Sequence, residues 1–143
     1  MIRSTLAILA ASTALVCAPA AAHDPEAREL LWADEFNSAE LDRDNWQVIG
    51  TDFWVNNEQQ AYIDRPEALQ IVEDAPGADG GALMLRPVYQ PGVDPHPERQ
   101  ADFLSGRVES QGKFDFTYGR AEARIKMPDA VGVWPAFWAL GNE

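Results

Sequence analysis

Charged and apolar side chains alternate at every second position over residues 120–127, which read RAEARIKM. A period of two residues places the two kinds of side chain on opposite faces of a β-strand. The pattern therefore predicts a half-buried strand in this segment. No part of the chain keeps a helical period for a dozen residues, so helices are not expected to build the fold.

Three other segments resemble short strands separated by turn residues. Residues 68–74 (ALQIVED) and 81–89 (GALMLRPVY) are apolar runs bounded by Asp-Ala-Pro-Gly and Pro-Gly. Residues 106–120 (GRVESQGKFDFTYGR) are predicted to form two strands joined near Gly112. Short strands punctuated by glycine and proline are typical of an all-β sandwich. The segment 90–103, which contains three prolines and four charges, is predicted to be an exposed loop, either bordering a ligand groove or simply decorating the surface.

The first 22 residues differ in composition from the rest of the chain. Arg3 precedes an apolar run, and the small residues that end at Ala22 form a cleavage site, as in a secretory signal peptide. The alternative of a membrane anchor is disfavoured because the run is too short to span a bilayer. Lipidation at Cys17 ranks below simple cleavage. We therefore expect export, to the periplasm or the medium, and a mature domain over residues 23–143 without a disulfide.

The chain is acidic, with a formal net charge of −12. Acidic surfaces repel phosphate backbones and anionic lipid headgroups, so nucleic acids and membranes are poor candidate partners. Neutral ligands and cations remain as partners.

Amide side chains cluster at residues 56–60 (NNEQQ), between Trp54 and Tyr62. Amides hydrogen-bond hydroxyl groups, and aromatic rings cover the apolar faces of sugars, so Asn56 and Asn57 are candidate sugar ligands. A polar turn is the equally weighted alternative.

Arginine and tryptophan supply further candidate ligands in two predicted strands. Arg107 offers five fixed donors that could fork onto hydroxyls in a groove, or it could solubilise the surface. Trp134 and Trp138 stand beside Gly132 and Pro135 and resemble a stacking platform, with burial in the core as the alternative.

The sequence suggests two possible metal sites. Asp34 and Glu35 could donate oxygen to calcium, although an edge strand with a solvated face is the simpler interpretation. His23 would become the N-terminal residue after cleavage, and with His96 it could chelate copper as in secreted polysaccharide monooxygenases, although two histidines in a chain are unremarkable.

Four segments, taken together, resemble one family. These are LLWADEFNSAELDRDNW, NNEQQAYIDRPE, LSGRVESQGKFDFTYGRAEARIKMP and GVWPAFWALG. Their order and spacing are similar to those of glycoside hydrolase family 16, and most similar to its laminarinase branch of endo-β-1,3-glucanases. The resemblance covers about residues 30 to 141. It implies a concanavalin A-like β-jelly-roll of two antiparallel sheets, incomplete in this chain, with a cleft for β-glucan.

The resemblance also implies roles for particular residues. Those expected to bind substrate on the non-reducing side of the scissile bond are Asn56, Asn57, Arg107, Trp134 and Trp138. Glu35 and the carbonyl near Gly81 resemble part of a structural calcium site, and catalysis itself requires no cofactor.

The two catalytic glutamates of the family belong to an E-x-D-x-x-E strand that follows the W-P-A-F-W block. Retaining hydrolysis requires their carboxyl groups about 5 to 5.5 Å apart. That motif is absent here, and it is expected beyond Glu143 in a longer reading frame. We expect the full-length protein to be a secreted β-1,3- or mixed-linkage glucan hydrolase and this chain alone to be inactive. The alternative is a non-catalytic β-glucan-recognition protein of the same fold.

Overall fold

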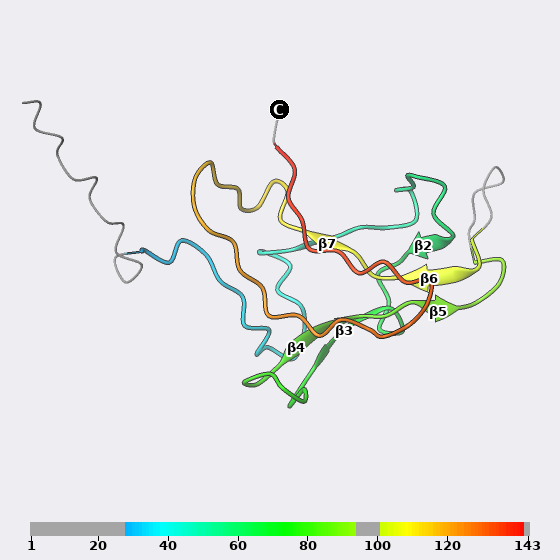
Figure 1. Cartoon of the computed structure of the whole chain (residues 1–143), viewed down its shortest axis with the longest axis horizontal. Helices are drawn as coiled ribbons and strands as arrows, with labels where there is room; N and C mark the ends of the chain where they lie inside the picture. The colour runs from blue at the N-terminus through cyan, green and yellow to red at the C-terminus, as the bar shows by residue number, and fades with distance from the viewer. Residues whose placement is uncertain (1–27, 94–100, 142–143) are drawn as a thin grey trace, which may run out of the picture. The chain divides into compact units, whose positions relative to one another are not determined.

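The structure, a computed structural model, describes residues 28–93 and 101–141 (Figure 1). All regular elements within these ranges are β-strands, and they belong to the unit formed by residues 32–143. The strands are β1 (Gln47–Val48), β2 (Gln60–Tyr62), β3 (Leu69–Val72), β4 (Ala82–Leu85), β5 (Val88–Tyr89), β6 (Phe103–Ser105) and β7 (Val108–Glu109). The predicted all-β class is confirmed. Nowhere in the described ranges is there a helix long and apolar enough to cross a bilayer.

Strands β3 and β4 form an antiparallel hairpin, in which Leu69 pairs with Leu85 and Ile71 with Leu83 (Figure 1). The two apolar segments predicted from residues 68–74 and 81–89 thus pair with each other. The Pro-Gly turn between them closes through a hydrogen bond from the Ala75 amide to the Gly80 carbonyl, at 3.3 Å.

Strand β6 lies between β2 and β5 in a three-stranded sheet. It pairs antiparallel with β5 and parallel with β2, in the register Ala61 to Leu104. The parallel pair departs from the predicted antiparallel pattern. A parallel pair is possible because the long connection through β3, β4 and β5 brings β6 beside β2 in the same direction.

Strands β1 and β7 form a separate antiparallel pair, with Gln47 opposite Glu109 and Val48 opposite Val108. The ladder continues past β1, because the Ile49 amide donates to the Arg107 carbonyl at 3.0 Å. Arg107 therefore has a fixed backbone position between β6 and β7, although it belongs to neither strand.

The hydrophobic core gathers around β2, β3 and β6. Its buried side chains are Leu41, Ile49, Ala61, Tyr62, Ala68, Leu69, Ala101 and Leu104. Gly106 joins β6 to β7 at a close approach, since a Cβ atom there would lie 2.7 Å from the Ala68 carbonyl oxygen. Small residues at such positions let the backbones of neighbouring strands approach one another.

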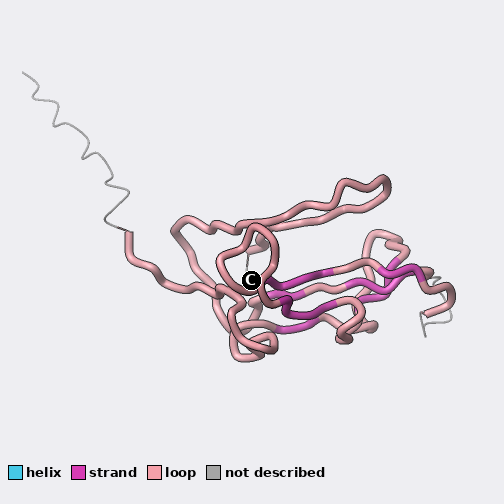
Figure 2. The backbone as a smooth tube through the Cα atoms, turned by 90° about the horizontal axis from the view of Figure 1, so that it is seen from below, coloured by secondary structure: helices cyan, strands magenta, loops and turns pink. Residues whose placement is uncertain are grey.

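The chain after β7 differs from the sequence-based prediction. Figure 2 shows it as loop throughout, and residues 120–127 form no strand and are exposed. Of the two strands expected around Gly112, β7 and the turn are present and the second strand is absent. Alternation can supply an apolar face, but a strand also needs a hydrogen-bonded neighbour, and no described segment pairs with residues 114–141. The prediction of a half-buried strand at residues 120–127 was wrong for this reason.

Several predictions concern residues outside the described ranges. These are the signal peptide, the copper ligands His23 and His96, and the middle of the proline-rich loop. The described ends of that loop are joined, because the Gln90 amide donates to the Asp102 carbonyl at 2.8 Å.

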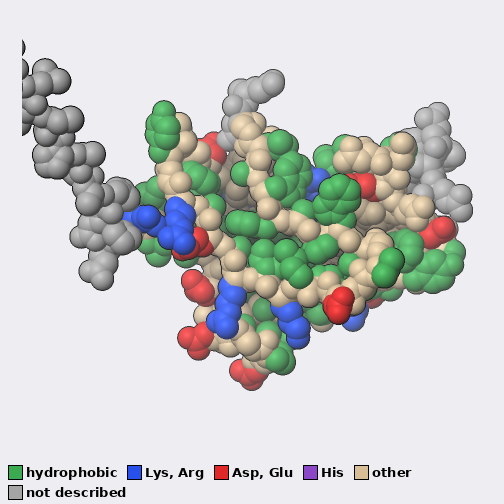
Figure 3. Space-filling model, viewed as in Figure 1, with side chains coloured by type: hydrophobic (Ala, Val, Ile, Leu, Met, Phe, Trp, Pro, Cys, Tyr) green, Lys and Arg blue, Asp and Glu red, His purple; other side chains and the backbone are tan. Residues whose placement is uncertain are grey.

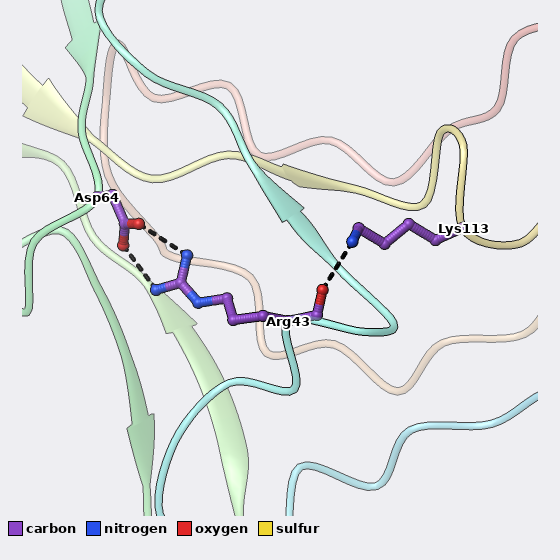
Figure 4. A network of polar contacts seen from close by, with 3 residues as sticks. All are labelled: Arg43, Asp64 and Lys113. Atoms are coloured by element: carbon purple, nitrogen blue, oxygen red, sulfur yellow. Dashed lines mark hydrogen bonds and ion pairs between the residues drawn. The ribbon is translucent and has the colours of Figure 1, made fainter.

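An ion pair between Arg43 and Asp64 links the loop before β1 to the residues after β2 (Figure 4). Arg43 donates from both terminal nitrogens to the Asp64 carboxylate, at 2.7 and 2.8 Å. The Lys113 ammonium donates to the Arg43 carbonyl at 2.8 Å, which adds the turn after β7 to the same network. These three contacts link segments that lie far apart in the sequence.

Replacing Asp64 with asparagine is expected to lower stability near neutral pH by no more than about 1 kcal/mol, since the pair is half exposed. The Arg43 hydrogen bonds hold the pKa of the Asp64 carboxyl below its usual range. A lowered carboxyl pKa stabilises the fold above the unfolded-state value, about 3.9, and this contribution is lost as the pH falls through the folded-state value. Thermal unfolding should therefore separate the two proteins at neutral pH and not in strong acid. An equal difference at both pH values would contradict this account.

Candidate functional site

A cleft of about 770 Å³ lies where β1, the end of β7 and the loop after β1 meet residues 138–140. We call it the Arg107 cleft. Its walls combine apolar groups, such as Phe53 and Leu140, with amides and carboxylates. Hollows of this size and mixed lining are typical of small-ligand sites.

The Arg107 guanidinium lies among aromatic rings in this cleft. Its central carbon is 4.2 Å from the Phe53 ring centroid, 5.4 Å from that of Trp138 and 5.8 Å from that of Tyr62. Cation–π contacts of this kind hold a guanidinium in place without occupying all of its N–H donors. The side chain remains 20% exposed, so a ligand can reach those donors.

Glu58 also lines the cleft and is held by two neighbours. The Tyr62 hydroxyl donates to the Glu58 carboxylate at 3.0 Å, and the Gln60 amide donates to the Tyr62 hydroxyl at 3.1 Å. Burial, together with the nearby Glu58 carboxylate, raises the pKa of Tyr62, so the hydroxyl stays protonated as a donor. The Trp54 indole N–H donates to the Glu58 carbonyl at 3.0 Å.

The two asparagines occupy a tight turn before Glu58. Asn56 and Asn57 have φ angles of 56° and 53°, in the left-handed region that asparagine tolerates better than most residues. Both side chains are exposed. Asn56 contributes to the lining of the cleft, and Asn57 does not.

The two tryptophans of the last segment differ in position. Trp138 lines the cleft beside Arg107, whereas Trp134 is outside its lining and 93% exposed. Figure 3 shows apolar side chains gathered across one face of the molecule. Of the five residues predicted to bind substrate, three line this cleft: Asn56, Arg107 and Trp138.

Some cleft residues were not among the predicted ligands. Phe53 carries no signal in the sequence, because its role depends on the fold of the loop after β1. Glu109 stands two residues after Arg107, and a period of two places both side chains on one face of a strand. That spacing could have identified Glu109.

The predicted calcium position lies elsewhere in the molecule. Gly81 lines a hollow of about 210 Å³ together with Phe36, Glu73 and Asp74, and Glu35 is not part of that lining. The Gly81 amide donates to the Asn37 side chain at 2.9 Å. Calcium takes six to eight oxygen ligands, and the described residues hold no group of three or more carboxylate, histidine or cysteine side chains placed to bind a metal. A calcium ion here would therefore depend on oxygen ligands other than these side chains.

Comparison with known proteins relates the chain to enzymes that act on polysaccharides. Glycosyl hydrolases family 16 matches residues 52–143. Glucan endo-1,3-beta-glucosidase A1 of Niallia circulans is 31% identical over 80% of this chain and 17% of its own length. Beta-glucanase of Rhodothermus marinus is 33% identical over 80% of this chain and 37% of its own length.

A shorter match involves a binding protein. Beta-1,3-glucan-binding protein of Penaeus monodon is 47% identical over 36 residues, which make up 25% of this chain and 10% of that protein. The chain therefore spans well under half the length of the relatives named here. No solved structure matches it significantly.

Proposed function

Because the chain belongs to glycosyl hydrolases family 16, we propose that its protein is a secreted endo-acting β-glucan hydrolase of the laminarinase type. The chain supplies part of the substrate cleft, and the substrate is a β-1,3- or mixed-linkage glucan. Hydrolysis proceeds with retention at the anomeric carbon. The names of the two glucanase relatives support this substrate class.

The observation that carries the proposal is the placement of Arg107 beside Trp138 in a cleft that also contains Asn56. Glucose units present apolar ring faces and a rim of hydroxyl groups. A tryptophan ring can cover the former, while guanidinium and amide groups hydrogen-bond the latter. Residues far apart in the sequence thus meet in one cleft, and their chemistry suits a glucan. Asn57 and Trp134 lie outside the lining of the cleft, and they remain proposed substrate-binding residues.

We assign substrate binding, and no bond cleavage, to the carboxylates of the cleft. Glu58 accepts a hydrogen bond from Tyr62, and Glu109 is paired with Arg107. Retaining hydrolysis needs a nucleophile and a proton donor on either side of the scissile bond. The E-x-D-x-x-E strand expected after residue 143 is proposed to supply both.

A glucan-recognition protein of the same fold is the second candidate. The relative from Penaeus monodon, named as a glucan-binding protein, favours it. The same cleft residues would then hold the polysaccharide without cleaving it.

Hydrolysis of laminarin separates the two candidates. The protein, expressed in full from its own gene, is incubated with laminarin, new reducing ends are measured, and the first anomer formed is identified by NMR. We expect internal cleavage with the β-anomer appearing first. Binding without new reducing ends would support the recognition protein, and neither binding nor cleavage would refute the proposal.

Replacing Trp138 with alanine is expected to weaken laminarin binding roughly tenfold, or about 1.4 kcal/mol, because the indole ring would no longer cover the apolar face of a sugar. Replacing Trp134, which lies outside the lining, should have a smaller effect. Affinity electrophoresis in laminarin gels measures both variants side by side. A larger loss for Trp134 than for Trp138 would place the sugar elsewhere.

Secretion and a structural calcium ion are further parts of the proposal. The composition of residues 1–22 supports secretion, and N-terminal sequencing of protein recovered from the medium or periplasm tests cleavage after Ala22. Calcium near Glu35 and Gly81 would need oxygen ligands in addition to the described side chains. Its role would be structural, and it would take no part in the reaction.

A further inference from the structure

Among the described residues that line it, the Arg107 cleft has one cationic side chain and three carboxylates, those of Asp52, Glu58 and Glu109. Its lining is therefore net negative, like the chain as a whole. A net negative cleft repels anionic ligands, and partial burial reduces the screening of that repulsion by salt.

Glu109 is the carboxylate that partners the arginine. Its Oε2 atom lies 3.4 Å from the Arg107 terminal nitrogen, and the two side chains are only 22% and 20% exposed. One carboxylate oxygen occupies part of the guanidinium fork and leaves other N–H donors free for neutral acceptors. It also offsets the positive charge that a sulfate or carboxylate group would require.

We propose that Glu109 determines specificity: by pairing with Arg107 it fits the cleft to uncharged glucan and excludes chains that carry sulfate or carboxylate groups. This inference rests on the proposed function, since it concerns the same cleft. Sugar hydroxyls are uncharged and can accept hydrogen bonds from the N–H donors that the paired guanidinium retains. A sulfate group would have to compete with Glu109 for the positive charge of Arg107 while approaching Asp52 and Glu58.

The chain contains a matched control for this pair. Arg120 and Glu122 also form an ion pair two residues apart, but their side chains are 59% and 66% exposed and lie outside the cleft lining. Changing Glu122 to glutamine removes the same charge from the same kind of pair. It therefore reports the effect of net charge alone.

The test compares binding of laminarin with binding of sulfated laminarin of the same chain length. The protein is expressed in full from its own gene. Binding is measured at low temperature, at both low and high salt concentrations. The natural protein should prefer laminarin at least tenfold at low salt, and added salt should reduce the preference only in part, because the Arg107–Glu109 pair is mostly buried. In Glu109→Gln, the ratio of the two affinities should shift roughly tenfold toward the sulfated chain, while Glu122→Gln leaves it within twofold.

Each outcome bears on the proposal. An unchanged ratio in Glu109→Gln would overturn it and leave Glu109 a merely structural partner of Arg107. Should that variant fail to fold, equal affinity of the natural protein for the two polymers would overturn the proposal by itself, and a preference for laminarin that persists at high salt would support it. Absence of laminarin binding by the natural protein would overturn the proposed function, and this inference with it.

Discussion

Replacing Arg107 with alanine is expected to weaken laminarin binding roughly a hundredfold, or about 2.7 kcal/mol. The guanidinium is the only cationic group among the described cleft residues, and it lies against the Phe53 and Trp138 rings. Its loss removes hydrogen bonds from a charged donor, worth about 1.5 to 3 kcal/mol, and leaves Glu109 without its partner. Titration calorimetry with laminarin measures the change.

Two further variants define this effect. Arg107→Lys keeps the charge without the planar fork and should recover only part of the affinity. Arg120→Ala removes an arginine from the exposed pair outside the cleft and should bind laminarin like the natural protein. Equal losses for Arg107→Ala and Arg120→Ala would show that general charge, rather than the cleft, governs binding.

Replacing Gly81 with alanine is expected to destabilise the fold by about 3 kcal/mol, the upper part of the range for overpacking. A Cβ atom at this position would collide with the Phe36 carbonyl oxygen. The Phe36 carbonyl belongs to the backbone and the Cβ atom is bonded directly to the backbone of residue 81, so neither can move away as the end of a flexible side chain could. The Gly81 amide also donates to the Asn37 side chain, and displacement would break that bond. Thermal unfolding monitored by circular dichroism measures the loss.

Gly141 is the matched control for this substitution. A Cβ atom there would meet nothing within 4 Å, and its φ angle is not in the left-handed region. Gly141→Ala should therefore unfold at the temperature of the natural protein. Comparable destabilisation by both substitutions would contradict the close approach of Gly81 to Phe36.

Two of the strands that the sequence predicted correctly, β3 and β4, have their partners nearby in the chain. The segment at 68–74 pairs with the one at 81–89 across a Pro-Gly turn, so local pattern and turn chemistry agree. The segment at 120–127 has a clearer alternation and no strand. Alternation shows that the two faces of a strand would differ in polarity. Whether the strand forms depends on a neighbouring strand, which the local sequence does not identify. The jelly-roll class itself followed from the family resemblance and agrees with the all-β structure.

The candidate site was predictable in residue types and only partly in geometry. Side-chain chemistry makes Arg107, Asn56 and Trp138 candidates, the family resemblance implies that they bind substrate, and all three line one cleft. Their meeting depends on β7 and on the path of the chain after it, which no local pattern encodes. Phe53 was missed for the same reason, since its contact with Arg107 joins residues more than fifty positions apart.

Hydrogen–deuterium exchange with and without laminarin tests the central claim most directly, because it locates the ligand on the chain. The protein expressed in full from its own gene should show slower exchange in peptides covering residues 53–58, 107–111 and 137–140, which supply the cleft. Peptides from the β3–β4 hairpin, away from the cleft lining, should be unchanged. Protection confined to other segments, or no protection at saturating laminarin, would contradict the assignment of the Arg107 cleft as the glucan site.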